Sequence, residues 1–127
     1  MYQSSAEFVA SKEDQKQGWY FLKLDDDFSR YYNFLCNQQL LRWQLPMNGC
    51  HCTVIAGEKE GRIVSRSEAL NFLGKDMFFQ YDGIVYTDGR TFWMNIESED
   101  LKKVREAFGL KPRILHITLG NLKGLQR

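Results

Sequence analysis

The chain has 127 residues, a length that suits one compact domain better than two. Hydrophobic residues make up 43% of it and charged residues 26%, so it carries enough apolar material for a core and is not of the disordered class. Seventeen Lys and Arg against sixteen Asp and Glu leave a net charge of +1, which argues against binding of long duplex nucleic acid through phosphate contacts. A small anionic ligand remains compatible with this charge.

Cysteine content and the polar start of the chain indicate a reducing compartment. The three cysteines cannot all pair within one chain, and no stretch has the apolar length of an export signal or a membrane span. We therefore expect a cytoplasmic protein with no membrane contact. Residues 1–17 are interpreted as a polar N-terminal arm, either solvated or a marginal helix, and residues 18–127 as a single domain.

The first half of this domain predicts a strand, a helix and further strands. The aromatic and aliphatic run at 19–24 predicts a mostly buried strand. Apolar residues then recur every three or four positions over 27–39, which predicts an amphipathic helix with its apolar stripe towards a sheet. A short strand over 40–45 and a turn at 48–49 lead to a strand over 50–56.

The second half predicts the same order of elements after a connecting region. A glycine-bounded polar loop at 57–61 precedes a short helix capped by Ser65 or Ser67. The remaining predicted elements are strands over 77–81, 84–86 and 91–96, a helix over 99–108 capped by Ser98, and a strand over 114–119. An Asp88-Gly89 step predicts a hairpin between the second and third of these strands.

Strand, helix and strand therefore occur twice in the same order, which predicts a degenerate internal duplication. The fold class that we expect is α+β, in an α/β two-lobed arrangement. Two pseudo-symmetric β-α-β lobes would place antiparallel sheets around a central groove, with the helices outside.

The only two histidines of the chain stand in matching motifs, because His51 is followed two places on by Thr53 and His116 by Thr118. Both would have Ser or Thr at that spacing by chance with a probability of about 1%. Each motif lies at a predicted strand, where side chains alternate, so each histidine shares a face with its threonine. We predict that the two strands present two imidazoles and two hydroxyls to one cleft.

This set of groups suits cleavage of a phosphodiester. Imidazole has a pKa near ~6.5, so one ring can take a proton from the nucleophile while the other protonates the leaving oxygen. Threonine hydroxyls can donate hydrogen bonds to the non-bridging phosphate oxygens. The chemistry predicts no metal and no cofactor, and it leaves open which histidine is the base.

A zinc site is the alternative that the run Cys50-His51-Cys52 suggests. Alternation sends His51 to the opposite face from both cysteines, and no second Cys/His pair occurs at ligand spacing. The same alternation argues against Cys52 as a nucleophile paired with His51.

The two motifs resemble the 2H phosphoesterase superfamily, which is named for its two His-x-Thr/Ser motifs. Gly18-Trp19-Tyr20 and the strand at 115–119 look most like LigT-like phosphodiesterases and the small phage anti-CBASS nucleases, which cleave cyclic oligonucleotide signals. The resemblance implies a bilobal fold and metal-independent hydrolysis of a cyclic di- or trinucleotide, or short oligonucleotide, at a 3′-5′ phosphodiester. It would act in the host cytoplasm if phage-encoded. RNA-end processing of 2′,3′-cyclic phosphates or 2′-5′ linkages is one alternative, and a non-enzymatic nucleotide-binding sponge is another.

Aromatic and basic residues near the motifs are candidates for substrate binding. The resemblance places Tyr20 where the phage enzymes have a tyrosine near the substrate. Trp43 and Trp93 could each stack on a base, and Lys123 and Arg113, which flank the second motif, could meet phosphate. Each has an alternative interpretation, since aromatic residues of strands often lie in the core and basic residues on the solvated surface.

Overall fold

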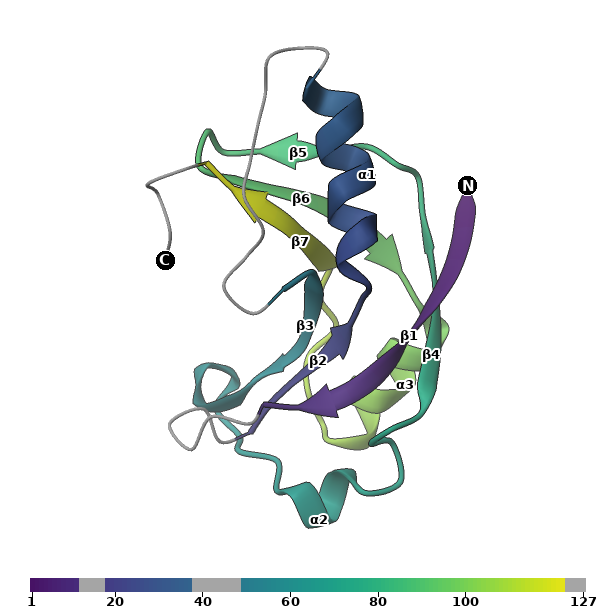
Figure 1. Ribbon diagram of the computed structural model, residues 1–127. Helices are drawn as coiled ribbons and strands as arrows, with labels where there is room; N and C mark the ends of the chain where they lie inside the picture. The colour runs from purple at the N-terminus through teal and green to yellow at the C-terminus, as the bar shows by residue number, and fades with distance from the viewer. Residues whose placement is uncertain (12–17, 38–48, 123–127) are drawn as a thin grey trace.

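The computed structural model describes residues 1–11, 18–37 and 49–122. Its strands are β1 (Tyr2–Ala10), β2 (Trp19–Lys23), β3 (His51–Ala56), β4 (Asp76–Tyr81), β5 (Tyr86–Thr87), β6 (Thr91–Glu97) and β7 (Leu115–Asn121). The helices are α1 (Asp26–Asn37), α2 (Arg66–Ala69) and α3 (Glu99–Ala107), with a 3₁₀ turn η1 (Gly57–Glu60) after β3 (Figure 1). None of the described helices is long and apolar enough to cross a membrane.

The strands pair in antiparallel fashion and close into a ring. Their order is β4-β1-β2-β3-β7-β6-β5, and β6 pairs back with β4 through Gln80 opposite Glu97 and Tyr81 opposite Ile96. Six strands thus form a closed barrel, to which β5 adds as a short outer strand. The predicted α+β class with antiparallel pairing is confirmed. The strands belong to one continuous sheet, whereas the sequence predicted the sheets of two lobes.

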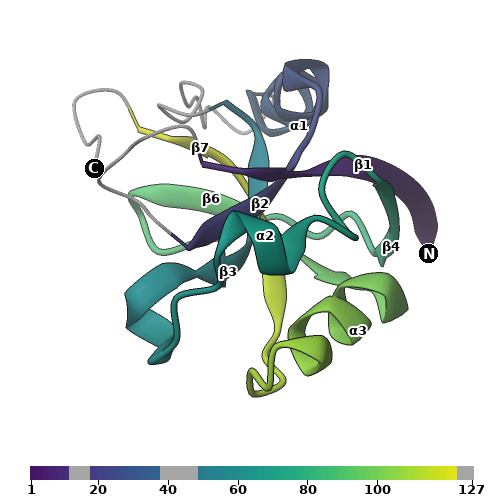
Figure 2. The ribbon, with the colours of Figure 1, turned by 90° about the horizontal axis from the view of Figure 1, so that it is seen from below.

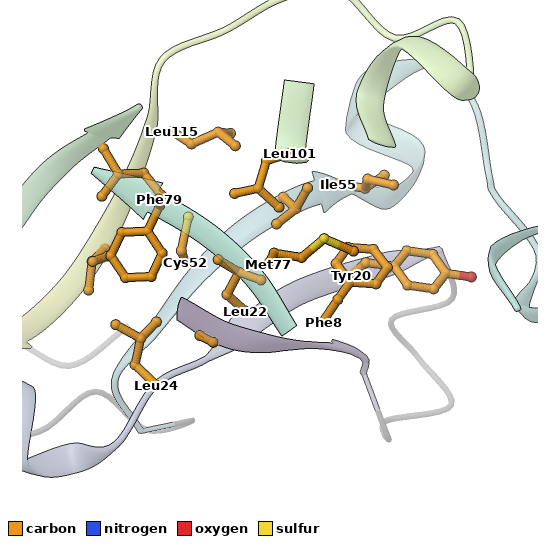
Figure 3. Packing of buried hydrophobic residues seen from close by; sticks show 14 of the residues in the cluster. Phe8, Tyr20, Leu22, Leu24, Cys52, Ile55, Met77, Phe79, Leu101 and Leu115 are labelled. Carbon is orange, nitrogen blue, oxygen red and sulfur yellow. The ribbon is translucent and has the colours of Figure 1, made fainter. Parts of the chain in front are cut away.

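Alternation of side chains along the strands fills the barrel with apolar groups. The core includes Phe8, Tyr20, Leu22, Leu24, Cys52, Ile55, Met77, Phe79, Leu101 and Leu115 (Figure 3). Burial of each large apolar side chain stabilises the fold by roughly 1.5–3 kcal/mol. Helix α3 contacts β4 and β3, while α1 contacts β7, so the two longer helices lie on different sides of the barrel (Figure 2).

The N-terminal arm predicted at 1–17 is wrong for the residues that form β1. This strand pairs with both β2 and β4, and the side chains of Ala6 and Phe8 are buried inside the barrel. The ring of Phe8 stacks on Tyr20 with the centroids 5.6 Å apart. The sequence pattern was weak because the inward positions of β1 include only small residues besides Phe8. Residues 12–17 lie outside the described part of the chain.

Several local predictions are confirmed. Ser65 Oγ accepts a hydrogen bond from the backbone N–H of Glu68, and Ser98 Oγ accepts one from Leu101, so each serine caps its helix. The hairpin at Asp88-Gly89 forms between β5 and β6. The strand predicted at 40–45 lies outside the described residues.

Helix α1 departs from its predicted packing. Tyr32 is buried, but Tyr31 is 57% exposed and Leu35 is also exposed, so the predicted stripe does not cover the sheet as a whole. Ser29 is buried as well, and its hydroxyl donates to the backbone oxygen of Leu119 in β7. A polar contact therefore replaces part of the expected apolar one.

A buried ion pair ties the η1 turn to α3, where the sequence predicted only a polar loop. The Arg105 guanidinium donates to both carboxylate oxygens of Glu60, to Val54 O at 2.7 Å and to Lys111 O. Glu60 Oε2 also accepts from the backbone N–H of Ala56 at 2.8 Å. The hydrogen bonds from Arg105 hold the pKa of Glu60 below its ordinary value. This pair fixes the end of β3 against α3.

Candidate active site

Pairing of β3 with β7 brings the two His-x-Thr motifs together. His51 lies opposite Thr118 and Cys52 opposite Ile117, and by strand alternation Thr53 and His116 share the face of His51 and Thr118. Residues directly opposite in an antiparallel pair have Cβ atoms about 4.5–5.5 Å apart, and diagonal neighbours are about 7–8 Å apart. The two histidines therefore lie on one diagonal of a four-residue patch and the two threonines on the other.

This patch lies on the outer face of the barrel. All four of its side chains are partly exposed, whereas Cys52 and Ile117 between them are fully buried. Cys50 is buried as well, and burial raises the pKa of both the Cys50 and Cys52 thiols to about 12. The thiols thus lie away from His51, as alternation predicted. Within the described ranges no group of three or more His, Cys, Asp or Glu side chains could hold a metal ion.

The ring of His51 is held by a backbone carbonyl. Its Nδ1 lies 2.7 Å from Gly49 O, and since a carbonyl oxygen can only accept, Nδ1 carries the hydrogen in this contact. Nε2 is then the nitrogen left to exchange a proton with a ligand. The ring also meets the edge of Phe21 on β2, with the centroids 5.8 Å apart and the planes at 67°.

The environment of His116 differs from that of His51. Burial is the main cause that lowers the pKa of His116 below its ordinary value, and the positive charges of Arg113 and His51 lower it further. Its ring meets Trp93 on β6, with the centroids 6.4 Å apart and the planes at 62°. The lowered pKa favours the neutral ring, the state in which an imidazole can accept a proton.

The strands beside the two motifs repeat the same pattern of neighbours. The registers are Phe21 opposite Thr53 and Lys23 opposite His51 on one side, and Trp93 opposite Thr118 and Asn95 opposite His116 on the other. Each threonine thus has an aromatic neighbour and each histidine a polar one. Sequence reasoning missed Phe21, Lys23 and Asn95. Strict alternation within 19–24, matched to that of the first motif, would have indicated Phe21 and Lys23.

The prediction that Tyr20 contacts the substrate is wrong. This side chain is 1% exposed, lies inside the barrel against Phe8, and donates its hydroxyl to Val64 O at 2.7 Å. The register of β2 on β3 shifts at a β-bulge between Tyr20 and Phe21, and the ring of Phe21 is the one that contacts His51. Trp43 and Lys123 lie outside the described residues. Arg113 Nη1 lies 3.8 Å from Glu60 Oε1, and its positive charge also lowers the pKa of His116.

A separate cavity of about 550 Å³ lies along α3 and the start of β7, and its lining includes neither histidine. No protein-family model matches the chain, and no curated protein or solved structure matches it. The geometry of the four-residue patch is therefore the main indication of function.

Proposed function

We propose that the chain is a metal-independent phosphodiesterase of the 2H type that cleaves a cyclic di- or trinucleotide at a 3′-5′ phosphodiester. The observation that carries the proposal is the β3–β7 register, which sets two imidazoles diagonally across two hydroxyls on an exposed face. A phosphate over the centre of such a patch would have a proton acceptor on one side, a proton donor on the other and two hydroxyl donors beneath it.

In the proposed reaction His116 is the base and His51 the acid. His116 takes the proton of a 2′-hydroxyl or a water as that oxygen bonds to phosphorus, and the bond from phosphorus to the departing ribose oxygen breaks. His51, protonated at Nε2, gives that proton to the leaving oxygen. The lowered pKa of His116 and the hydrogen bond from His51 Nδ1 to Gly49 O support this order, since a carbonyl acceptor stabilises the charged imidazole.

Thr53 and Thr118 would donate to the non-bridging oxygens of the phosphate. Charge on these oxygens grows in the transition state, so a hydroxyl fixed beside them lowers the barrier. Lys23, which is exposed opposite His51, can add a positive charge at the rim of the patch.

Aromatic side chains on both sides of the patch support a substrate with more than one base. Phe21 touches His51 and Trp93 touches His116, and Tyr86 stacks behind Trp93 with the centroids 6.3 Å apart. Base stacking on such rings contributes about 1–3 kcal/mol per base. Trp93→Ala should therefore raise KM by about 10-fold or more for a dinucleotide. The net charge of +1 favours a compact ligand over long RNA.

The proposal includes two pseudo-symmetric halves around the patch. The pairing of β2 with β3 corresponds to that of β6 with β7, and the pairing of β1 with β2 to that of β4 with β6. The remaining pairs of the six-stranded barrel, β3 with β7 and β1 with β4, each join a strand to its own counterpart. This correspondence supports a duplicated origin, with the substrate seated at the seam of the halves. A counter-defence role in a host cytoplasm is the biological setting that the resemblance suggests.

A substrate panel in EDTA tests the proposal. The protein is incubated with 3′,3′-cGAMP, 2′,3′-cGAMP, cyclic tri-adenylate, 2′-5′ oligoadenylate and 2′,3′-cyclic nucleotides, and the products are separated by chromatography. We expect linear products from the cyclic oligonucleotides. Turnover of 2′-5′ oligoadenylate or 2′,3′-cyclic nucleotides alone would favour RNA-end processing, and tight binding with no turnover would favour a sponge.

Two histidine variants test the mechanism directly. His51→Ala and His116→Ala should each lower kcat by about 10²–10⁴-fold, since each removes one proton transfer. Lys102→Ala, at an exposed position of α3, serves as the control and should keep full activity. Full activity in either histidine variant would exclude the two-histidine mechanism.

A further inference from the structure

We infer that Asp26, at the start of α1, is a positioning residue for His51 and acts through the peptide group that joins Gly49 to Cys50. The inference rests on the proposed function, because it concerns a histidine to which that function gives a catalytic role. It adds a residue outside the four-residue patch and a physical path from that residue to the imidazole.

One peptide group makes hydrogen bonds at both of its ends. The N–H of Cys50 donates to Asp26 Oδ1 at 3.0 Å, and the carbonyl of Gly49, which belongs to the same peptide group, accepts from His51 Nδ1 at 2.7 Å. Carboxylate, peptide and imidazole therefore form one continuous chain of hydrogen bonds. This chain links α1 to the first residue of β3.

The backbone around this peptide is fixed in a way that suits the contact. Gly49 has a φ of +76°, a left-handed conformation that favours glycine, and a Cβ there would lie 3.1 Å from Asp26 Oδ1. The carbonyl of Cys50 accepts from the N–H of Leu24 at 3.1 Å, which ties the turn to the end of β2. The absence of a side chain at position 49 thus lets the carboxylate approach the peptide.

Neighbouring aspartates in the same run make different contacts. Asp25 Oδ1 accepts from the N–H of Asp27 at 2.9 Å, and Asp27 pairs with Arg30 in an exposed ion pair. The contact with the Gly49–Cys50 peptide is made by Asp26, which is partly buried, unlike its two exposed neighbours.

The chain of hydrogen bonds has two consequences for His51. Hydrogen bonds in series polarise one another, so a carboxylate on the N–H makes the carbonyl at the other end a stronger acceptor. A stronger acceptor holds Nδ1 as the protonated nitrogen, with Nε2 free for the substrate, and it stabilises the charged imidazole that a general acid requires. Two other groups, Lys23 on β2 and His116 on β7, face His51 from the packed strands. When they are protonated, their positive charges oppose a positive charge on the His51 ring.

The variant Asp26→Asn separates this role from a purely structural one. Asparagine keeps the size of the side chain and an oxygen that can accept from Cys50, but it removes the negative charge. Asp27→Asn removes the same charge one residue away and is the matched control. Circular dichroism and the melting temperature check that both variants fold.

Nitrogen-15 NMR of the imidazoles provides a measurement that does not depend on turnover. In the unmodified protein we expect His51 to be the Nδ1–H tautomer when neutral. In Asp26→Asn we expect the share of the other His51 tautomer to rise, because the Gly49 carbonyl becomes a weaker acceptor, while Asp27→Asn matches the unmodified protein. We also expect kcat to drop about 10-fold in Asp26→Asn with little change in KM, as for other residues that orient a reacting group.

The inference is overturned if His51 in the unmodified protein is the Nε2–H tautomer, or if the shares of its two tautomers are the same in Asp26→Asn as in Asp27→Asn. A changed tautomer of His51 in Asp26→Asn, in a protein that hydrolyses none of the panel, would sustain the inference and remove only the proposed function. If Asp26→Asn does not fold, Asp26→Ser, which keeps an oxygen suited to a helix start, takes its place in the same comparison.

Discussion

Arg105→Met should destabilise the protein strongly, because it breaks the buried pair that joins η1 to α3. The side chains of Arg105 and Glu60 are 4% and 12% exposed, and the guanidinium makes five hydrogen bonds that methionine cannot make. Removal of one partner of such a pair costs about 3–5 kcal/mol, since the other charge is left buried. The whole stability of a domain is only about 5–15 kcal/mol, so we expect a melting temperature lower by about 10–20 °C.

Urea and thermal unfolding followed by circular dichroism measure this effect. Arg30→Met is the control, because Arg30 pairs with Asp27 on the surface, where the two side chains are 64% and 78% exposed, and it should cost about 1 kcal/mol or less. The double variant Arg105→Met/Glu60→Leu should recover much of the loss, since it leaves no unpaired charge. A loss in Arg105→Met no larger than in Arg30→Met would refute the reasoning.

Three further predictions follow from burial. Tyr20→Phe should lower the free energy of unfolding in urea by about 0.5–1.5 kcal/mol, because the hydrogen bond to Val64 O is lost, and it should leave KM unchanged. A raised KM would contradict the core position of this ring. With the third cysteine removed by Cys36→Ser, Cys50 and Cys52 should not react with a disulfide reagent at pH 8 until the protein is unfolded. Labelling of these thiols in the folded protein would contradict their raised pKa values. The pKa of Glu60 is lower in the folded protein than its ordinary 4.5, so the stabilisation from its charged form is present above pH 4.5 and is lost as the pH falls through the folded value. Glu60→Gln should abolish this part of the acid dependence of the urea midpoint. An unchanged dependence would count against the ion pair.

The part of the site that sequence could predict depends on a short-range rule. Alternation along a strand sets His51 and Thr53 on one face, and it needs no knowledge of the rest of the fold. The prediction of Tyr20 came from the family resemblance, whereas Phe21 is the residue that lies at the patch. The caps at Ser65 and Ser98 were equally predictable, because they depend on residues three positions away.

The closure of the barrel depends on contacts that no local pattern encodes. β1 pairs with β4 across about seventy residues, and its inward positions carry too little apolar surface to mark a strand. The pair of Glu60 and Arg105 joins a loop to a helix forty-five residues away, and each residue by itself is typical of a solvated surface. The contact from Asp26 to the Gly49–Cys50 peptide spans twenty-four residues, which a run of three similar aspartates could not reveal.

The position of β7 between β3 and β6 has a consequence for how fast activity can arise. Both neighbours of β7 precede it in the chain, and the two motifs that it joins are sixty-five residues apart, so the patch exists only after this strand has inserted. Non-local pairing of this kind is typical of domains that fold in milliseconds to seconds rather than microseconds. During refolding from urea, recovery of catalysis would therefore report the docking of β7, and it should not precede the recovery of the β-sheet signal.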